Sequence, residues 1–408
     1  MLKDILEYGT NNPYELMNTF YKVGNETLLT LRNLSTKPEN AKQPRTWNAS
    51  ELPDLVKVSK TTINKLISNN NDIPGIILSD NSKNKRFTLE AVNKLRELAG
   101  TKYKRPKNSE TMILAVSNFK GGVGKTETAV DLSKKLAIEG LRTLLIDFDA
   151  QATATLISAG LIPDLELDYE DTITNSLLKD FNLIKDVIIP THFNGLNLIP
   201  ANLAIQDCDL MLPDDKQNNV EKLDSPVLRL EKALKLIKDD YDVIVIDCGP
   251  NLGMLTLNAI CACNAILIPI PPSMSDYSSF VMYTSSLKCL FEEFPNKKLN
   301  YLRIVLTKHN GGNEALKMEN MMRSQFGSYV LTNHMCETVE VLKAATDIGT
   351  VYDICKPSGS REAYKRAIQY LDNLNMEIIN NFKEIWSNQS KQNIIKENQH
   401  ERSEEICA

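Results

Sequence analysis

The residues Ser117–Lys125, SNFKGGVGK, restrict the possible folds of this chain more strongly than any other stretch. They follow an apolar run, Met112–Val116, that is typical of a short buried strand, and they open a helical pattern. Gly121, Gly122 and Gly124 lack a Cβ, so the backbone there can adopt positive φ and turn its N–H groups onto an anion at a helix N-terminus. The order strand, glycine loop, helix therefore predicts a phosphate-binding loop.

Two lysines and a threonine give this loop its chemistry. The common pattern G-x-x-x-x-G-K-[ST] fails at its first position, Phe119, and the sequence fits x-K-G-G-x-x-K-[ST] instead, with Lys120 at the loop entrance. Lys125 is placed to reach β- and γ-phosphate oxygens, and the Thr126 hydroxyl is placed to ligate Mg²⁺. The loop therefore predicts a site for a magnesium-bound nucleotide.

Two further apolar runs end in aspartates. Thr143–Asp149 (TLLIDFD) ends in Asp147 and Asp149, and Tyr241–Pro250 (YDVIVIDCGP) contains Asp247. An aspartate after a run of β-branched residues is expected at the carboxyl end of a parallel strand, the edge where open α/β sheets bind ligands. Asp247 is predicted to hold Mg²⁺ through water. The chemistry would be in-line transfer of the γ-phosphoryl group to water, catalysed mainly by positioning and charge neutralisation.

These motifs resemble the ParA/MinD group of P-loop ATPases, whose deviant Walker motif reads KGGVGKT. In that group the extra lysine is understood to reach across a dimer interface to the partner's nucleotide, which gives Lys120 a catalytic role beside Lys125. Asp149, in a segment similar to the group's D-x-D-P-Q motif with Ala150 in place of proline, is the candidate to orient the attacking water. Together with RIVLTKHN (303–310), the resemblance implies ATP or ADP with Mg²⁺, held by Thr126 and Asp247 at the metal and by Lys120, Gly121, Gly122, Val123, Gly124, Lys125, Thr126, Glu127, Thr307 and Lys308 at the nucleotide.

Glu127 departs from the group's pattern. It stands where the group usually has a second threonine, whose hydroxyl contacts the α-phosphate. A carboxylate there adds like charge beside the nucleotide, so slow hydrolysis or weakened nucleotide binding is expected.

A basic segment lies within an acidic chain. Residues 41–108 carry fourteen Lys and Arg against six Asp and Glu, a net charge of +8, whereas the whole chain of 408 residues has −5 and the rest therefore −13. This imbalance suggests a polyanion partner, with a solvated charged face as the alternative.

The basic segment has the pattern of a helix-turn-helix. Trp47–Leu66 predicts a helix from about Ala49 to Val56, a tight turn at Lys57–Ser59, and a second helix that Ser59 caps. A hairpin at 73–86 and a helix capped by Thr88 follow, so the segment resembles a winged helix-turn-helix. The predicted DNA-binding residues are Lys60, Thr61, Thr62, Asn64 and Lys65 on the second helix, and Lys83, Lys85 and Arg86 in the wing. A protein-docking or purely structural role is the alternative.

The larger plasmid-partition ATPases of the ParA/SopA kind share this order of parts. The resemblance implies an α/β fold: a P-loop NTPase fold with a mostly parallel twisted sheet flanked by helices, preceded by an all-α or winged helix-turn-helix domain and an N-terminal helix. We expect a helical dimerisation segment at 1–40, the DNA-binding domain at 41–107 and the ATPase domain with C-terminal helices at 108–408. Two helical stretches are expected within the first segment, and packing on its own domain is the alternative to dimerisation.

The C-terminal region suggests two further roles. Lys343 matches a family lysine implicated in sequence-independent DNA binding, and Arg361, with Lys365 and Arg366, could extend a basic strip, although an ordinary solvated face is the alternative for these three. An amphipathic stretch, Ile378–Trp386, lacks the basic excess of membrane-surface helices, so it is predicted to pack in a core or a dimer.

The resulting functional hypothesis is a DNA-segregation ATPase. It would dimerise on ATP as a homodimer, coat nucleoid DNA without sequence preference, respond to a ParB-type centromere-binding partner, and bind a specific operator to regulate its own operon. Two alternatives remain: a nucleotide-controlled transcriptional repressor and a membrane-associated positioning ATPase like MinD. No long apolar stretch or signal peptide is found, and the histidines have no metal-ligand spacing, so we expect a cytoplasmic, nucleoid-associated protein without zinc.

Overall fold

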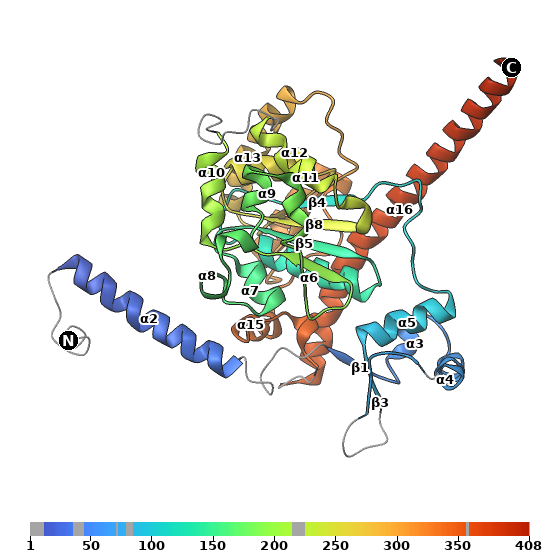
Figure 1. The fold of residues 1–408 in the computed structure, drawn as a ribbon, viewed down its shortest axis with the longest axis horizontal. Coiled ribbons are helices and arrows are strands. Elements are labelled where there is room, and N and C mark those ends of the chain that lie inside the picture. The colour runs from blue at the N-terminus through green and yellow to red at the C-terminus, as the bar shows by residue number, and fades with distance from the viewer. Residues whose placement is uncertain are drawn as a thin grey trace. The chain divides into compact units, whose positions relative to one another are not determined.

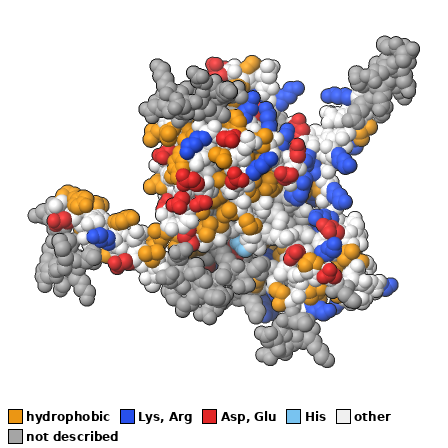
Figure 2. Space-filling view, in the orientation of Figure 1, with side chains coloured by type: hydrophobic (Ala, Val, Ile, Leu, Met, Phe, Trp, Pro, Cys, Tyr) orange, Lys and Arg blue, Asp and Glu red, His pale blue; other side chains and the backbone are white. Residues whose placement is uncertain are grey.

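The computed structural model describes residues 12–35, 45–70, 72–78, 85–213, 225–355 and 359–407. The chain divides into two compact units, Met1–Gln43 and Pro44–Ala408 (Figure 1). In the first unit, the described residues form one uninterrupted helix, α2 (Pro13–Ser35), and the earlier part of the segment in which two helical stretches are expected lies outside the described residues. Its exposed apolar side chains (Figure 2) include Tyr14, Met17, Phe20, Tyr21 and Leu28. A dimerisation role for this helix stays a prediction.

The basic segment folds into three helices and a small antiparallel sheet. The elements are β1 (Thr46–Asn48), α3 (Leu52–Val56), α4 (Lys60–Asn69), β2 (Ile76–Leu78), β3 (Lys85–Thr88) and α5 (Leu89–Ala99), with strand order β1-β3-β2. Ser59 caps α4, because its hydroxyl accepts the Thr62 N–H at 3.2 Å. Helix α3 begins at Leu52 rather than near Ala49, because the Glu51 carboxylate accepts the Asn48 N–H at 2.6 Å and closes a turn first.

Arg96 of α5 joins this segment to the large sheet domain. The side chain is 3 % exposed, and its guanidinium donates to the carbonyls of Leu55 in α3 at 3.0 Å and of Ile138 at 2.6 Å. A charge pair, Lys57 with Glu139, lies beside it at 3.8 Å. The apolar residues of α3 and α5 are also continuous with one core of the large sheet.

The large domain is built on seven strands in the order β10-β9-β4-β8-β5-β7-β6. All neighbouring pairs are parallel except β6 with β7. The mostly parallel sheet confirms the predicted fold class. The strands are β4 (Met112–Val116), β5 (Thr143–Phe148), β6 (Ile189–Pro190), β7 (Leu196–Ile199), β8 (Val243–Cys248), β9 (Ala265–Ile270) and β10 (Tyr301–Leu306).

Helices cover both faces of this sheet, as Figure 1 shows. Because successive strand residues point to opposite faces, each strand contributes to two separate apolar cores. One core packs against α6 (Lys125–Ile138), α7 (Thr153–Ala159), α15 (Val339–Thr346) and α16 (Arg361–Cys407). The other packs against α9 (Thr174–Leu178), α10 (Asp207–Met211), α11 (Arg229–Leu234), α12 (Met254–Ala262), α13 (Met274–Glu293) and α14 (Asn313–Phe326).

Short elements complete the connections between these helices and strands. They are α8 (Pro163–Glu166) and the 3₁₀ helices η1 (Tyr169–Asp171), η2 (Phe181–Lys185), η3 (Leu203–Gln206), η4 (Pro226–Leu228), η5 (Lys238–Asp240), η6 (Gly327–Tyr329) and η7 (Val351–Asp353).

The apolar face of α16 is part of the core. Ile378, Ile379, Phe382 and Trp386 are fully buried, and the Trp386 indole N–H donates to the Glu110 carbonyl at 2.8 Å. This confirms the prediction that the stretch packs in a core. Among the described residues, no helix is both long and apolar enough to span a membrane.

Arg96 offers a test of how the basic segment is held. We expect Arg96→Met to lower the free energy of unfolding by about 2 kcal/mol or more, because it leaves the buried carbonyls of Leu55 and Ile138 without their donor. Lys94→Ala changes a partly exposed side chain on the same helix, so it is the matched control and should cost less than about 0.5 kcal/mol. Urea unfolding of both variants makes the comparison, and equal losses would contradict the assignment.

Candidate nucleotide site

In the glycine loop between β4 and α6, two of the three glycines, Gly122 and Gly124, have positive φ, and Gly121 does not. Gly122 and Gly124 have φ of 72° and 85°, in the region that glycine adopts most easily, and Gly124 is the N-cap of α6. A Cβ built on Gly122 would meet no atom within 4 Å, whereas one on Gly124 would come within 3.2 Å of Glu127 Oε2 and 3.4 Å of Thr307 Cβ. The loop is therefore open on one side and closely backed on the other.

The two lysines of the loop have different partners. Lys125 is 6 % exposed, and its ammonium donates across the loop to the Lys120 carbonyl at 3.0 Å. Burial lowers the pKa of Lys125, while the charge of Asp247 opposes that shift. The Lys120 ammonium turns away from the loop, 2.8 Å from Asp276 Oδ1 and 3.1 Å from Ser275 Oγ at the start of α13.

Asp247 is a buried carboxylate at the carboxyl edge of the sheet. Its register aligns it with Val116, the last residue of β4, and with Asp147 of β5. It is 0 % exposed, and within the described ranges neither of its oxygens has a hydrogen-bond partner. Burial and the charge of Asp147 raise the pKa of Asp247 well above its ordinary value, against the nearby Thr126 hydroxyl and Lys125 ammonium.

An unpaired buried carboxylate is costly, so this one fits a bound cation. The hard oxygen donors of Asp247 and Thr126 suit Mg²⁺, which is usually held by one or two such groups, waters and substrate phosphates. The residues present therefore fit the metal that the sequence suggested.

Asp147 and Asp149 have separate positions. Asp147 is fully buried and accepts the N–H and the hydroxyl of Thr155 at 2.8 and 2.7 Å, and the Asp149 N–H at 3.1 Å. Burial raises the pKa of Asp147 to about 6. Asp149 is only partly buried and accepts the Gln151 N–H at 3.0 Å. Asp147 therefore anchors the turn that presents Asp149.

The strand β10 ends beside the glycine loop. The Thr307 hydroxyl donates to the Val123 carbonyl at 2.7 Å, and Lys308 is exposed with a φ of 50°. Lys308 lines a cleft of about 430 Å³ together with Ser273 and Asn310. Glu127 is exposed in the first turn of α6.

Sequence reasoning missed the partners of Lys120. Ser273 and Asp276 form an S-x-x-D capping pattern at the start of α13, where the Ser273 hydroxyl accepts the Asp276 N–H at 3.2 Å. That pattern could have located the helix start. It could not have shown that Lys120, far away in the chain, pairs with Asp276.

The predicted DNA-binding residues of the basic segment lie on α4 and in the predicted wing. Those on α4 are exposed, as expected: Lys60, Thr61, Thr62, Asn64 and Lys65.

In the predicted wing, Lys85 is exposed, but the Arg86 guanidinium donates to Thr46 Oγ1 at 2.9 Å and to Asn48 Oδ1 and the Thr46 carbonyl, both at 2.7 Å. Arg86 therefore ties β3 to β1. Lys83 lies outside the described residues.

The C-terminal basic residues are near one another. Lys343 on α15 pairs with Glu340 at 3.1 Å. The Lys343 ammonium also lies close to Gly359, 3.2 Å from the point where a Cβ on that glycine would be. Arg361, two residues further along, begins α16, and Lys365 and Arg366 follow on its exposed surface. Figure 2 shows further Lys and Arg side chains along the side of the view where α16 lies.

A group of potential metal ligands lies beyond β10. Nitrogens of His309 and His334 and a carboxylate oxygen of Glu319 lie within 4.8 Å of one another, from three separate elements, so sequence spacing could not reveal them. Internal contacts already involve Glu319 and His309: Arg323 pairs with Glu319 at 2.8 Å, His309 Nε2 lies 3.1 Å from Glu319 Oε2, and His309 Nδ1 accepts the Gly311 N–H at 3.2 Å. The imidazole rings of His309 and His334 also stack, with their centroids 4.1 Å apart. We interpret the group as structural.

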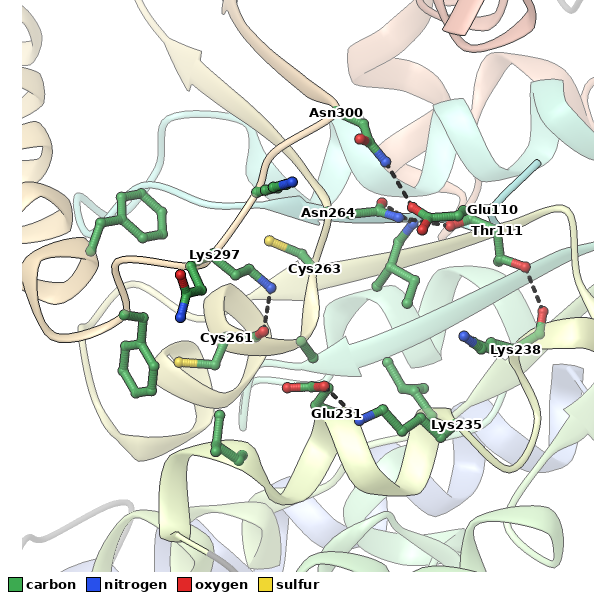
Figure 3. Close-up of a pocket in the computed structure, with 18 of the residues that line it drawn as sticks. Glu110, Thr111, Glu231, Lys235, Lys238, Cys261, Cys263, Asn264, Lys297 and Asn300 are labelled. Carbon is green, nitrogen blue, oxygen red and sulfur yellow. Dashed lines mark hydrogen bonds and ion pairs between the residues drawn. The ribbon is translucent and has the colours of Figure 1, made fainter. Parts of the chain in front are cut away.

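A cavity of about 760 Å³ lies at the opposite, amino edge of the sheet (Figure 3). Thr111, Asn264 and Asn300, which precede β4, β9 and β10, line it. Much of their hydrogen-bonding capacity is already used: Asn264 Oδ1 accepts the Ile113 N–H at 2.8 Å, and Thr111 Oγ1 donates to the Lys238 carbonyl at 2.8 Å. Because lysines and glutamates both line the cavity, its charge favours no single ligand class, and we assign it none.

Known proteins resemble this chain over most of its length. A family model described as an AAA domain matches residues 111–298. SopA of Escherichia coli (strain K12) is 34 % identical over 326 residues, which are 78 % of this chain and 82 % of SopA. The chain belongs to the ParA/SopA family of partition ATPases.

A second relative and a solved structure are also similar to this chain over most of its length. A putative replication protein A of Sinorhizobium fredii is 31 % identical over 380 residues, covering 88 % of this chain and 91 % of that protein. A solved structure described as a partition protein covers 88 % of this chain and 98 % of its own, with 20 % identity and a TM-score of 0.62, which shows the shared fold. In this partition ATPase, the residues at the carboxyl edge of the sheet fit ATP or ADP with Mg²⁺.

The buried Asp247 predicts a pH dependence. Mg²⁺-dependent ATP binding should weaken as the pH falls, because the raised pKa of Asp247 lets protons compete with the cation for the ionised carboxylate. Asp247→Asn should weaken binding and flatten this dependence. Titration of a fluorescent ATP analogue with Mg²⁺ or with a chelator measures both, and an unchanged pH slope in the variant would contradict the assignment.

Proposed function

We propose that this chain is an ATP-dependent DNA-segregation ATPase that dimerises on ATP, binds DNA without sequence preference in that state, and answers to a ParB-type centromere-binding partner. The observation that carries the proposal is the buried Asp247, which has no hydrogen-bond partner among the described residues and lies beside Lys125 at the edge where Asp149 also lies. Similarity over most of the chain to SopA supports the role in partition.

The residues of the site divide the hydrolytic work among them. Bound ATP with Mg²⁺ supplies the phosphoryl group and part of the neutralising charge. The loop N–H groups bind phosphate oxygens. The Lys125 ammonium leaves the Lys120 carbonyl and binds phosphate oxygens instead. Asp149, held in place through its N–H by Asp147, orients the attacking water.

Dimerisation requires a change at Lys120. Its ammonium is paired with Asp276 of its own subunit at 2.8 Å, so it must leave that carboxylate to reach a nucleotide across a dimer interface. Bound triphosphate in the partner would compete for the lysine with a higher negative charge than one carboxylate has. This exchange links dimerisation to the presence of the triphosphate.

Two surfaces are proposed to contact DNA. The exposed face of α4, with Lys60 and Lys65, would read a specific operator near the protein's own gene, and Lys85 would contact the flanking backbone. Lys343 and Arg361, which lie near each other at α15 and the start of α16, would bind nucleoid DNA through its phosphates. The second surface reads no sequence because phosphates carry none.

Two other functions share some of these features. A nucleotide-controlled repressor would use the same α4 surface, and it requires DNA binding by α4 but no role for Asp149. A membrane-associated positioning ATPase would need the apolar face of Ile378–Trp386 to contact lipid. Those side chains pack inside the protein instead. We therefore rank partition first and the repressor second.

DNA binding with each nucleotide state separates partition from repression. We expect random-sequence duplex to bind only with ATP, and Lys125→Ala to lose that binding by at least tenfold. Duplex from upstream of the gene should bind separately, and Lys60→Ala/Lys65→Ala should weaken it while sparing the ATP-dependent random binding. Electrophoretic mobility shifts with ATP, ADP and no nucleotide measure this, and upstream binding alone would favour the repressor.

Glu127 should limit nucleotide affinity. Its carboxylate is exposed in the first turn of α6, beside the loop that binds phosphate, so it repels an anionic ligand. We expect Glu127→Thr to bind ATP about threefold to tenfold more tightly by calorimetry, with Glu127→Gln intermediate because it removes only the charge. Equal or weaker affinity in the threonine variant would refute this role.

A further inference from the structure

Thr307 and the glycine loop share a buried hydrogen bond. The Thr307 hydroxyl donates to the Val123 carbonyl at 2.7 Å, and the two residues are 0 % and 1 % exposed. Thr307 directly follows β10, and its own N–H donates to the Ile270 carbonyl at the end of β9 at 3.0 Å. The hydroxyl therefore extends from a fixed point of the sheet to the middle of the loop.

This hydrogen bond sets the direction of one peptide group. Val123 lies between Gly122 and Gly124, which have positive φ and few steric limits of their own. Since a trans peptide is planar, its carbonyl and the following N–H point in opposite directions. A Val123 carbonyl held toward Thr307 therefore turns the Gly124 N–H away from Thr307, toward the open side of the loop.

Two sets of contacts fix the position of Thr307. Its Cβ and Cγ2 lie 3.4 and 3.5 Å from the point where a Cβ on Gly124 would be, so the side chain also backs the loop by contact. Next to it, the Leu306 carbonyl accepts the Met335 N–H at 2.8 Å, and the His309 N–H donates to the Met335 carbonyl at 3.1 Å. The strand end that carries Thr307 is thus held in place by its neighbours.

We propose that Thr307 is a positioning residue for phosphate binding: its hydroxyl holds the Val123 peptide so that the Gly124 N–H faces the nucleotide. The proposal rests on the proposed ATPase function. It differs from the role that the resemblance implied, in which Thr307 contacts the nucleotide, because the fully buried side chain gives its hydrogen to the loop.

Two near-isosteric variants separate the hydroxyl from the methyl group. Thr307→Val keeps the shape and removes the donor, and Thr307→Ser keeps the donor and removes the methyl. We expect Thr307→Val to raise the Kd of both ATP and ADP about tenfold, and the KM for ATP similarly, with kcat within about twofold because Thr307 touches no reacting atom. Thr307→Ser should bind within about twofold of the parent chain. A valine variant that binds normally, or a serine variant as weak as valine, would overturn the proposal.

Backbone hydrogen exchange without nucleotide gives an independent readout. The amides of Gly122–Thr126 should exchange faster in Thr307→Val than in Thr307→Ser, while amides of the central strands β4 and β8 stay unchanged. If the valine variant fails to fold, Thr307→Ala compared with Thr307→Ser answers the same question. Unchanged loop exchange in the valine variant would refute positioning, whereas a parent chain that binds no ATP would refute the proposed function and leave this readout valid.

Discussion

The nucleotide site depends on one electrostatic constraint: Asp247 is buried, and among the described residues neither of its oxygens has a hydrogen-bond partner. Folding places this carboxylate at the carboxyl edge of the central strand pair, with Asp147 in register beside it, and removes both from water. Such an arrangement costs free energy that the rest of the domain must supply, chiefly through the two apolar cores of the sheet. A bound cation would relieve the repulsion between the Asp247 and Asp147 carboxylates. Cation binding therefore explains why the folded protein keeps these two buried side chains.

The parallel register brings the other functional groups to the same edge. Val116 pairs with Asp247, so the glycine loop that follows β4 begins next to the carboxylate. Helix α6 begins with Lys125 at this loop and ends at Ile138, whose carbonyl accepts from Arg96. One helix therefore packs against both the nucleotide site and the basic segment.

Much of the site could be predicted from the sequence because its elements are local. A glycine loop between a strand and a helix needs no distant partner to be recognised, and aspartates at the ends of parallel strands meet at one edge by geometry. The side-chain partners could not be predicted in this way. Lys120 pairs with Asp276, Arg86 with β1 and Thr307 with the loop, and each of these contacts joins residues that are distant in the chain or on separate strands. The start of α3 depends instead on a local hydrogen bond, from the Asn48 N–H to the Glu51 carboxylate, which overrides the helical pattern.

The most direct test of the account is the release of inorganic phosphate from ATP by the purified chain with Mg²⁺. We expect slow phosphate release by the parent chain. Release should be lost in both Lys125→Ala and Asp149→Asn, whereas ATP binding should be lost only in Lys125→Ala, because Asp149 orients water and Lys125 binds phosphate. Turnover that survives Asp149→Asn, or a parent chain that binds no ATP, would contradict the assignment of this sheet edge as the catalytic site.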